Sequence, residues 1–164
     1  MIYLNQTSIQ IYDGDFIPTI NNISFEYDNF GNARAINNSG NIDIIGDEKL
    51  EIFSYVYNTT AFIVNKPNNY TLFSENLTVV KQVFYFYDNL TSGIIKGDLT
   101  KIRNFNNLGV NPEIQYIYDS FGNIIKEVEP LNYVTTFTYD SSGTYRIKET
   151  NELGHVIDYG YDLG

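Results

Sequence analysis

A short motif, Tyr-Asp-x-x-Gly, recurs along the chain and limits the folds that the sequence can adopt. One copy begins at Tyr118 and the next at Tyr139, 21 residues further on, and the first two residues of another, Tyr161-Asp162, follow after a further 22 residues. The aspartate carboxylate can accept hydrogen bonds from backbone N–H groups two residues on, and the glycine allows the positive φ of a tight turn. Each copy therefore predicts a β-hairpin in which the tyrosine ends a strand with its ring on the buried face.

Further copies lie upstream, and the copy at Tyr87 carries a two-residue insertion. The predicted turn residues are Tyr27, Asp28, Gly31, Tyr87, Asp88, Gly93, Tyr118, Asp119, Gly122, Tyr139, Asp140, Gly143, Tyr161 and Asp162. A hairpin of about 20 residues cannot bury its apolar face alone, so such units must stack edge to edge. The sequence predicts an all-β fold of tandem β-hairpin repeats in an extended antiparallel sheet or solenoid.

Period-two alternation and β-branched or aromatic residues support this prediction. They indicate strands over residues 51–57, 79–87, 113–118, 133–139 and 156–161. No stretch shows the apolar spacing of an amphipathic helix. The pattern predicts degenerate hairpin repeats with insertions over residues 1–111 and regular repeats of about 21 residues over 112–164, in one continuous structural unit.

Both chain ends lack processing signals. The first residues have neither a basic segment nor an apolar one, which argues against a signal peptide, and no apolar run is long enough to span a bilayer. The last residues begin a further Tyr-Asp motif. We therefore expect either a segment of a longer protein or a subunit with an unfinished sheet edge.

Composition excludes several function classes. Ten Lys and Arg against 20 Asp and Glu give a net charge of −10, which argues against nucleic-acid binding. Cysteine is absent and His155 is the single histidine, so thiol catalysis, Ser-His-Asp catalysis and multi-histidine metal sites are disfavoured. We expect no catalytic, cofactor-binding or metal-binding residues.

Acidic clusters at Asp13 with Asp15, and at Asp43, Asp47 and Glu48, allow two interpretations. Paired carboxylates serve glycosidases as acid and base, or bind Ca²⁺ with loop carbonyls. Neither cluster has a metal-binding spacing, so turn capping on a solvated surface is favoured. His155 is interpreted in the same way, as a structural residue beside a turn.

Asn-x-Ser/Thr sequons are more frequent than chance and all precede residue 92. They begin at Asn5, Asn22, Asn37, Asn58, Asn69, Asn76 and Asn89. One interpretation is an asparagine-rich composition with asparagine in turns. The other is an exported glycoprotein whose glycans shield the edges of an exposed sheet.

The segment from Tyr118 to Asp140 resembles, from start to finish, the YD repeat of the RHS (rearrangement hotspot) family. Residues 51–58, 63–67 and 86–100 resemble the longer repeats of RHS-type subunits in Tc-type insecticidal toxin complexes. Asn132 departs from the family pattern, which usually has glycine there. The resemblance implies a long strip of β-hairpins that spirals into a hollow shell, which encloses a cytotoxic domain in toxins and forms an adhesion scaffold in teneurin-like relatives.

These observations favour a non-enzymatic structural segment of a secreted or cell-surface protein, in a β-shell around a toxin or effector cargo. An extracellular filament and an adhesive or carbohydrate-binding scaffold remain alternatives, and a glycoside-active enzyme is the least favoured. The expected partners are further repeats, of the same or a neighbouring chain, that pair at strand edges. Enclosed protein cargo or surface glycans are further candidates, without nucleic acid or membrane insertion.

Overall fold

Twelve β-strands and no helix make up the part of the chain that the structure, a computed structural model, describes, namely residues 2–14 and 16–162. The strands are β1 (Gln6–Ile11), β2 (Thr19–Tyr27), β3 (Ala33–Asn41), β4 (Lys49–Asn58), β5 (Ile63–Ser74), β6 (Val79–Tyr87), β7 (Leu99–Asn104), β8 (Glu113–Tyr118), β9 (Ile124–Val128), β10 (Val134–Tyr139), β11 (Arg146–Thr150) and β12 (Val156–Asp158). Their order in the sheet is their order in the sequence, and neighbours run antiparallel. The all-β prediction of tandem hairpins is confirmed.

The five predicted strands are all present as β4, β6, β8, β10 and β12. The first extends beyond its predicted bounds to Lys49–Asn58, and the last ends early, at Asp158. The sequence patterns missed β5, which contains Pro67 and several asparagines. Proline is tolerated there because the β4–β5 register shifts between Ser54 and Tyr55, whose partner is Pro67. The described residues include no helix long and apolar enough to cross a bilayer.

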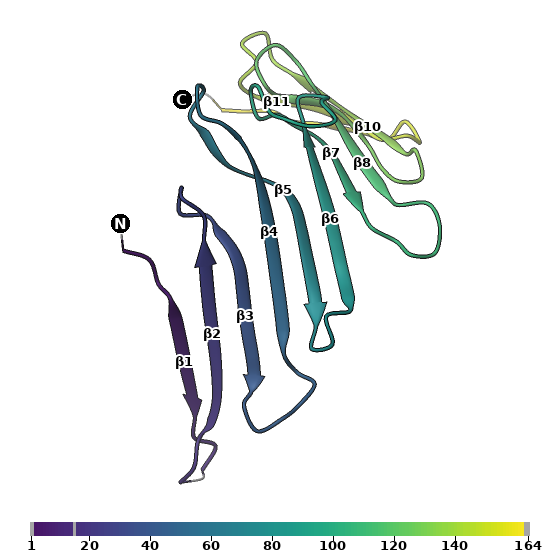
Figure 1. The fold of residues 1–164 in the computed structure, drawn as a ribbon. Coiled ribbons are helices and arrows are strands. Elements are labelled where there is room, and N and C mark those ends of the chain that lie inside the picture. Colours follow the sequence, from purple (N-terminus) through teal and green to yellow (C-terminus); the bar gives the residue numbers. More distant parts are fainter. Residues whose placement is uncertain (1, 15, 163–164) are drawn as a thin grey trace. The chain divides into compact units, whose positions relative to one another are not determined.

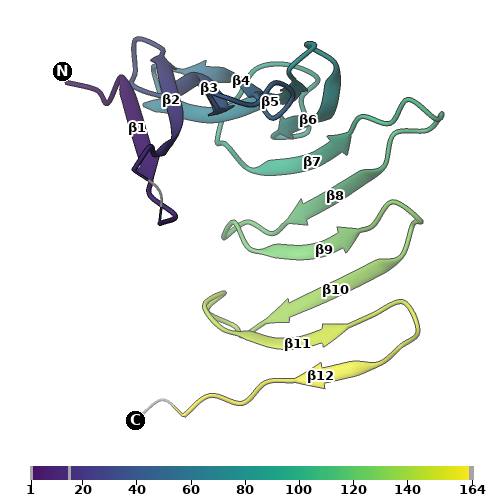
Figure 2. The same ribbon diagram turned by 90° about the horizontal axis from the view of Figure 1, so that it is seen from below.

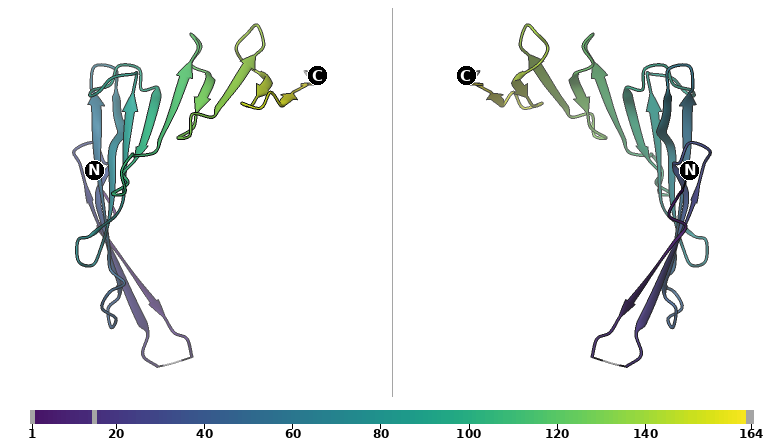
Figure 3. Two further views of the ribbon diagram at one scale, coloured as in Figure 1. Left: turned by 90° about the vertical axis from the view of Figure 1, so that its right-hand side faces the viewer. Right: turned by 90° about the vertical axis from the view of Figure 1, so that its left-hand side faces the viewer.

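The chain divides into two compact units, residues 1–84 and 85–164, with the boundary inside β6. In the first unit, β4 and β5 form the longest ladder, from Lys49 opposite Ser74 to Asn58 opposite Ile63 (Figure 1). The purple hairpin of β1 and β2 lies obliquely to the blue and teal strands of the same unit (Figure 3), as the twist of a β-sheet requires.

The second unit is a regular series of hairpins. Strands β7 to β12 lie side by side in sequence order, and their connections alternate between the two ends of the strands (Figure 2). Lys126 lies in β9 and Lys148 in β11, each in the strand that follows a Tyr-Asp turn. The turn between β9 and β10 places Asn132 at a φ of 66°. Asparagine tolerates this left-handed conformation, which explains its place where the family usually has glycine.

A register shift recurs at the tyrosine that ends each of three motif strands. The ladder shifts between Glu26 and Tyr27, between Ile117 and Tyr118, and between Thr138 and Tyr139. In each case one residue of the returning strand is skipped, as in a β-bulge. Bulges bend a strand and increase its twist, so every such hairpin receives the same local deformation.

Burial within each unit is shallow, because the strands form a single layer. The most buried apolar side chains are Val83, Tyr87 and Ile94, which are 4%, 5% and 6% exposed. Thr71 and Thr100 are buried polar residues. A layer that is covered on neither face keeps many apolar groups in water, and such layers normally bury a face against another layer.

Candidate functional site

The Tyr-Asp turns at Asp28 and Asp119 have the same geometry. Oδ1 of Asp119 accepts hydrogen bonds from the backbone N–H of Phe121 at 2.8 Å and of Asn123 at 2.9 Å. Oδ1 of Asp28 accepts the equivalent bonds from Phe30 and Asn32, both at 2.8 Å. The backbone of each aspartate also pairs with the residue four positions on. The carboxylate thus satisfies N–H groups that the turn takes out of the ladder.

The turn at Asp140 is one residue longer. The N–H of Asp140 donates to the carbonyl oxygen of Tyr145, five residues on. Its carboxylate accepts hydrogen bonds from the backbone N–H groups of Thr144 and Tyr145 and from the hydroxyl of Ser142. The aspartate therefore keeps its capping role although the loop length has changed.

The turn at Asp88 differs from the geometry that the motif suggests. The N–H of Asp88 pairs with the carbonyl of Asp98, and the carboxylate accepts hydrogen bonds from the backbone N–H groups of residues 95–98. The glycine directly before the pairing residue is Gly97, at a φ of 91°, whereas Gly93 lies inside a longer loop at 87°. The glycine that precedes the pairing residue is therefore Gly97 and not Gly93, and the Asp88 carboxylate forms hydrogen bonds across a longer loop.

These hydrogen bonds hold the aspartates in the ionised form. Burial raises the pKa of Asp28, but the bonds from Tyr57, Asn32 and Phe30 outweigh it and lower the pKa to about 2. The Ser142 hydroxyl, followed by the Tyr145 N–H, lowers the pKa of Asp140 to about 2. The pKa of Asp119 is lowered mainly by the backbone N–H of Asn123. A carboxylate that accepts several N–H bonds has little basicity left for proton transfer.

The pKa of Asp88 also falls below its ordinary value. Burial opposes this shift, but backbone N–H groups, from Ile95 first and then Gly97, outweigh it. Burial raises the pKa of Tyr87, the neighbouring tyrosine, to about 12.

In three copies of the motif, the tyrosine hydroxyl forms a hydrogen bond with a backbone carbonyl of the chain segment that precedes it. Tyr27 donates its hydroxyl hydrogen to the carbonyl oxygen of Leu4 at 2.9 Å, and Tyr118 donates to that of Leu99 at 2.7 Å. Tyr161 makes the same contact with the carbonyl of Arg146 at 2.8 Å. The hydroxyl thus satisfies a carbonyl near the end of the ladder, while the ring covers the sheet. The motif tyrosines were predicted to have buried rings, but Tyr139 is only half-buried and Tyr161 is exposed.

Two asparagines each link their own turn to the following hairpin by hydrogen bonds. Nδ2 of Asn123 donates to Oδ2 of Asp119 at 3.2 Å and to the carbonyl oxygen of Gly143 at 2.7 Å. Nδ2 of Asn32 similarly donates to Asp28 at 2.7 Å and to the carbonyl of Val64 at 2.6 Å. Each asparagine therefore ties its own turn to the following hairpin.

An aromatic ring reinforces each of these connections. The ring of Phe121 lies so close to Gly143 that a Cβ on the glycine would be 2.7 Å from it. The ring of Phe30 packs against Tyr57, with 5.0 Å between ring centroids. The sequence interpretation missed this role, although both turns share the signal Phe-Gly-Asn after the aspartate. It also missed that Asn58, which follows Tyr57, caps its own connection by accepting the N–H of Ala61.

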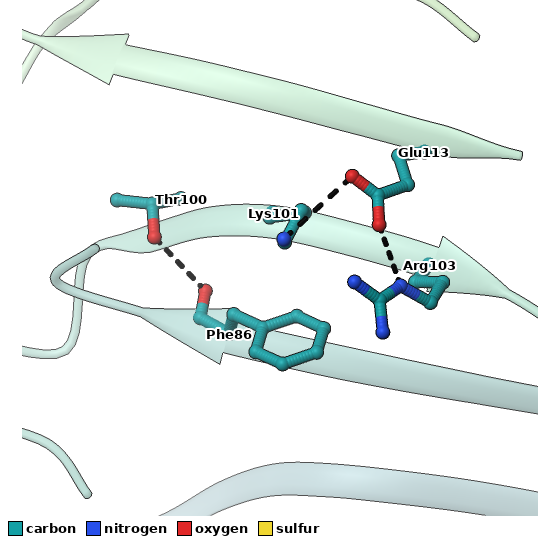
Figure 4. A network of polar contacts seen from close by, with 5 residues as sticks. All are labelled: Phe86, Thr100, Lys101, Arg103 and Glu113. Atoms are coloured by element: carbon teal, nitrogen blue, oxygen red, sulfur yellow. Dashed lines mark hydrogen bonds and ion pairs between the residues drawn. The ribbon is translucent and has the colours of Figure 1, made fainter. Parts of the chain in front are cut away.

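A polar network on β7 and β8 was likewise not foreseen. Glu113 forms ion pairs with Lys101 and Arg103, and both cations lie over the ring of Phe86, at 4.7 and 5.2 Å from its centroid (Figure 4). The hydroxyl of Thr100 donates to the carbonyl of Phe86 at 3.3 Å. Each charge is paired, so the network has the character of a cross-strand contact that stabilises the hairpin.

Two residues of the predicted acidic clusters, Asp47 and Glu48, cap backbone groups. Asp47 accepts the N–H of Asn41, and Glu48 accepts that of Gly46. Asp13 is exposed, and Asp15 lies outside the described residues. Within residues 2–14 and 16–162, no group of three or more His, Asp or Glu side chains is placed to hold a metal ion. The N–H of His155 donates to the side chain of Asn151 at 2.9 Å.

The seven sequons differ in accessibility. Asn5, Asn37, Asn76 and Asn89 are exposed, whereas Asn22, Asn58 and Asn69 are half-buried. The side-chain oxygen of Asn69 accepts the hydroxyl of Thr71, its own sequon threonine, which is 4% exposed. Glycosylation stays a prediction, and it is best supported at the four exposed positions.

Comparisons with solved structures find several chains of similar fold, among them chains of two structures that contain TccC3. A chain from the Photorhabdus luminescens Tc holotoxin pore, solved with a mutated TccC3, has a TM-score of 0.48 and 17% sequence identity, over 92% of this chain and 9% of that chain. A chain from the crystal structure of TcdB2-TccC3-Cdc42 has a TM-score of 0.47 and 17% identity, over 89% of this chain and 9% of that chain. No protein-family model matches the sequence, and no curated protein matches it.

This chain therefore spans about a tenth of the length of the chains that it matches. At 17% identity the likeness concerns the fold alone, an arrangement of successive antiparallel strands. The resemblance to RHS/YD repeats rests on the Tyr-Asp motifs and their spacing.

Proposed function

We propose that this chain is a non-enzymatic structural segment of an exported RHS/YD-repeat protein, and that its hairpins form part of a β-shell around a toxin or effector cargo. The observation that carries the proposal is the coupling of successive hairpins by the motif itself. Asn123 ties the turn of Asp119 to Gly143, and Asn32 does the same from the turn of Asp28 to Val64. A motif whose hydrogen bonds join neighbouring hairpins is expected in a repeat protein, because the stability of such a protein comes from interfaces between its units.

The outer strands support pairing with further repeats. Within the described residues, β1 and β12 each have one neighbour in the sheet. Tyr159 donates its N–H to the carbonyl of Ile147, which makes residues 157 and 149 a hydrogen-bonded pair in the same ladder. The N–H groups of Val156 and Asp158 consequently point away from β11. An exposed edge of this kind accepts another strand.

The state of the acidic groups supports a structural role. Asp28, Asp88, Asp119 and Asp140 accept backbone hydrogen bonds and have pKa values below the ordinary range of aspartate. A general acid needs the opposite shift, toward neutral pH. The proposed location is extracellular or on the cell surface.

Exposed ring pairs favour a second candidate, a cell-surface scaffold that binds carbohydrate. Tyr145 and Tyr161 lie with 4.8 Å between ring centroids and are 38% and 48% exposed. The exposed pair of Phe30 and Tyr57 lies on the first unit. Rings that are open on one face can stack on the apolar face of a sugar. An extracellular filament of strand-paired subunits is a further form of the same scaffold role.

Electron microscopy of the native polypeptide that contains this segment, together with its intact mass, tests the proposal. The expected result is a closed, hollow particle formed by a polypeptide much longer than this segment, with protease-resistant cargo inside. Long fibres of small subunits would contradict the shell and favour the filament. Hexose mass on Asn76 or Asn89 would support export, whereas native material without glycan would leave asparagine-rich composition as the reason for the sequons.

A further inference from the structure

The connections that lack the Tyr-Asp motif lie at the opposite ends of the strands from the Tyr-Asp turns, and they expose leucine side chains. In the second unit, Leu108, Leu131 and Leu153 occupy the connections β7–β8, β9–β10 and β11–β12, and they are 89%, 72% and 79% exposed. The leucines are 23 and 22 residues apart, close to the 21 and 22 residues that separate the motif tyrosines. Single exposed leucines are ordinary, but three at the repeat period form a pattern that solubility does not explain.

Two grooves lie between these successive turns. One, of about 440 Å³, has Val110, Pro130 and Glu129 among its lining residues. The other, of about 400 Å³, is lined by Glu129 again, together with Tyr133, Glu152 and Leu153. The grooves thus repeat once per hairpin, and each contains a carboxylate; the first is lined mainly by polar residues and the second mainly by apolar surface.

The carboxylates of Glu129 and Glu152 are free to bind a cation. Within the described residues, neither side chain takes part in an ion pair or hydrogen bond. No basic residue lines the second groove. The one in the first groove, Arg103, is already paired with Glu113. The charge of both grooves is therefore negative.

The spacing of the grooves indicates the form of the ligand. Successive turns on this side of the unit are separated by two strand spacings, about 10 Å, whereas a polyproline II chain has three residues per turn and advances about 3.1 Å per residue. Every third residue of a polyproline II chain lies on the same face and can therefore reach a groove. A second copy of this chain is a poor occupant, because its turn edges carry aspartates and glutamates and its net charge is −10.

We propose that these turns of the second unit bind a polypeptide segment in the polyproline II conformation, with a basic side chain at about every third residue and small apolar side chains between. The basic side chains meet Glu129 and Glu152, and the apolar ones contact Tyr133 and Leu153. The proposal holds whether the repeats form a shell or a scaffold, so it does not depend on the proposed function.

Fluorescence anisotropy with the full 164-residue chain tests this inference. The probes are three labelled peptides of equal length, made of repeated Lys-Val-Thr, Glu-Val-Thr and Lys-Ser-Ser. Only the first is expected to bind tightly, with an affinity that falls about tenfold or more as salt is raised. Equal binding of the Lys-Val-Thr and Lys-Ser-Ser peptides would overturn the apolar half of the proposal, and absence of saturable binding would overturn all of it.

Paired variants locate the site. Glu129→Gln combined with Glu152→Gln is expected to weaken binding of the Lys-Val-Thr peptide about tenfold, and Leu153→Ser several-fold. Glu26→Gln, which removes an exposed carboxylate from β2, is the control and is expected to leave the affinity unchanged. Equal affinities in all of these variants would contradict the assignment. Self-association that Leu153→Ser abolishes, without peptide binding, would replace the peptide with a second copy as the occupant.

Discussion

The residue that follows the glycine of a Tyr-Asp turn can join that turn to the next hairpin. Asn32 and Asn123 occupy this position, and each donates to a backbone carbonyl of the following hairpin, Val64 in β5 and Gly143. Thr144 occupies it in the turn of Asp140, and its hydroxyl contacts Ser142 of the same turn. A planar amide has two N–H groups and reaches both its own aspartate and a neighbour, whereas a threonine hydroxyl has a single hydrogen to donate.

Substitution of this asparagine tests the coupling. Asn123→Ala removes hydrogen bonds to Asp119 and Gly143, and it should lower the free energy of unfolding by about 1 kcal/mol. Urea denaturation of the 164-residue chain measures the change. Thr144→Ala is the matched control and should cost clearly less. Equal costs would show that the amide does not couple the turns.

Gly143→Ala separates backbone strain from crowding. Gly143 has a φ of 70° and faces the ring of Phe121, while Gly93 has a φ of 87° with nothing within 4 Å of an added Cβ. Both alanine variants bear the strain of a left-handed conformation, but only Gly143→Ala must displace the ring. We expect its melting temperature to fall further than that of Gly93→Ala. The same fall in both variants would exclude a contribution from the Phe121 contact.

The lowered pKa of Asp28 predicts loss of stability in acid. The folded state holds this pKa at about 2, below the ordinary 3.8, so the unfolded chain binds a proton first as the pH falls. The contribution is complete above about pH 5 and is lost as the pH falls through 3.8 toward 2. Thermal unfolding measured between pH 6 and pH 2 should show this decline. Asp28→Asn should flatten it, and an unchanged pH profile in this variant would rule out the hydrogen bonds to Asp28 as its cause.

At the scale of the strand, the tyrosine and the register shift beside it act together. The shift between Ile117 and Tyr118 twists β8 at its end, and the Tyr118 hydroxyl holds the carbonyl of Leu99 on the neighbouring strand. Tyr27 combines the same two features on β2. A bend and a hydrogen bond at the same register position give each motif hairpin the same end geometry, which regular stacking of repeats requires.

Tyr118→Phe measures the contribution of the hydroxyl. The variant keeps the ring but leaves the Leu99 carbonyl without this donor, and the free energy of unfolding should fall by about 1 kcal/mol. Tyr116→Phe on the same strand is the control, because the Tyr116 hydroxyl makes no hydrogen bond within the described residues. Chemical denaturation of both variants measures the change in the free energy of unfolding. A Tyr116→Phe cost as large as that of Tyr118→Phe would contradict the role of the contact.

At the scale of the whole molecule, the exposed edge of β12 predicts self-association of the isolated chain. Val156→Pro removes an N–H that points away from β11, so it should block the addition of a strand without breaking the existing ladder. Sedimentation velocity should show a lower average mass for this variant than for the parent. Val156→Thr keeps the N–H and should resemble the parent. Equal masses for Val156→Pro and Val156→Thr would show that this edge does not pair.

Several features could be predicted because they depend on neighbouring residues. Alternation over residues 113–118, and the β-branched and aromatic residues over 79–87, predicted strands whose bounds match β8 and β6, since both signals come from residues close together in the chain. The aspartate that caps its own turn was predictable for the same reason. The loop at Asp88 was not predictable, because the position of its last glycine depends on the nine residues between Asp88 and Asp98 and on which N–H groups reach the carboxylate.

The sequence by itself determined the fold class, the hairpin period and the capping role of aspartate in the turns of Asp28, Asp119 and Asp140, because these follow from contacts between residues close together in the chain. Only the tertiary structure decided that Asn123 reaches Gly143, that Tyr118 reaches Leu99, and that Glu129 borders two grooves. These pairs lie on different strands or turns, and their distances depend on strand register and on the recurring bulges. A shift of one residue in any ladder would separate them, and no local pattern encodes that register.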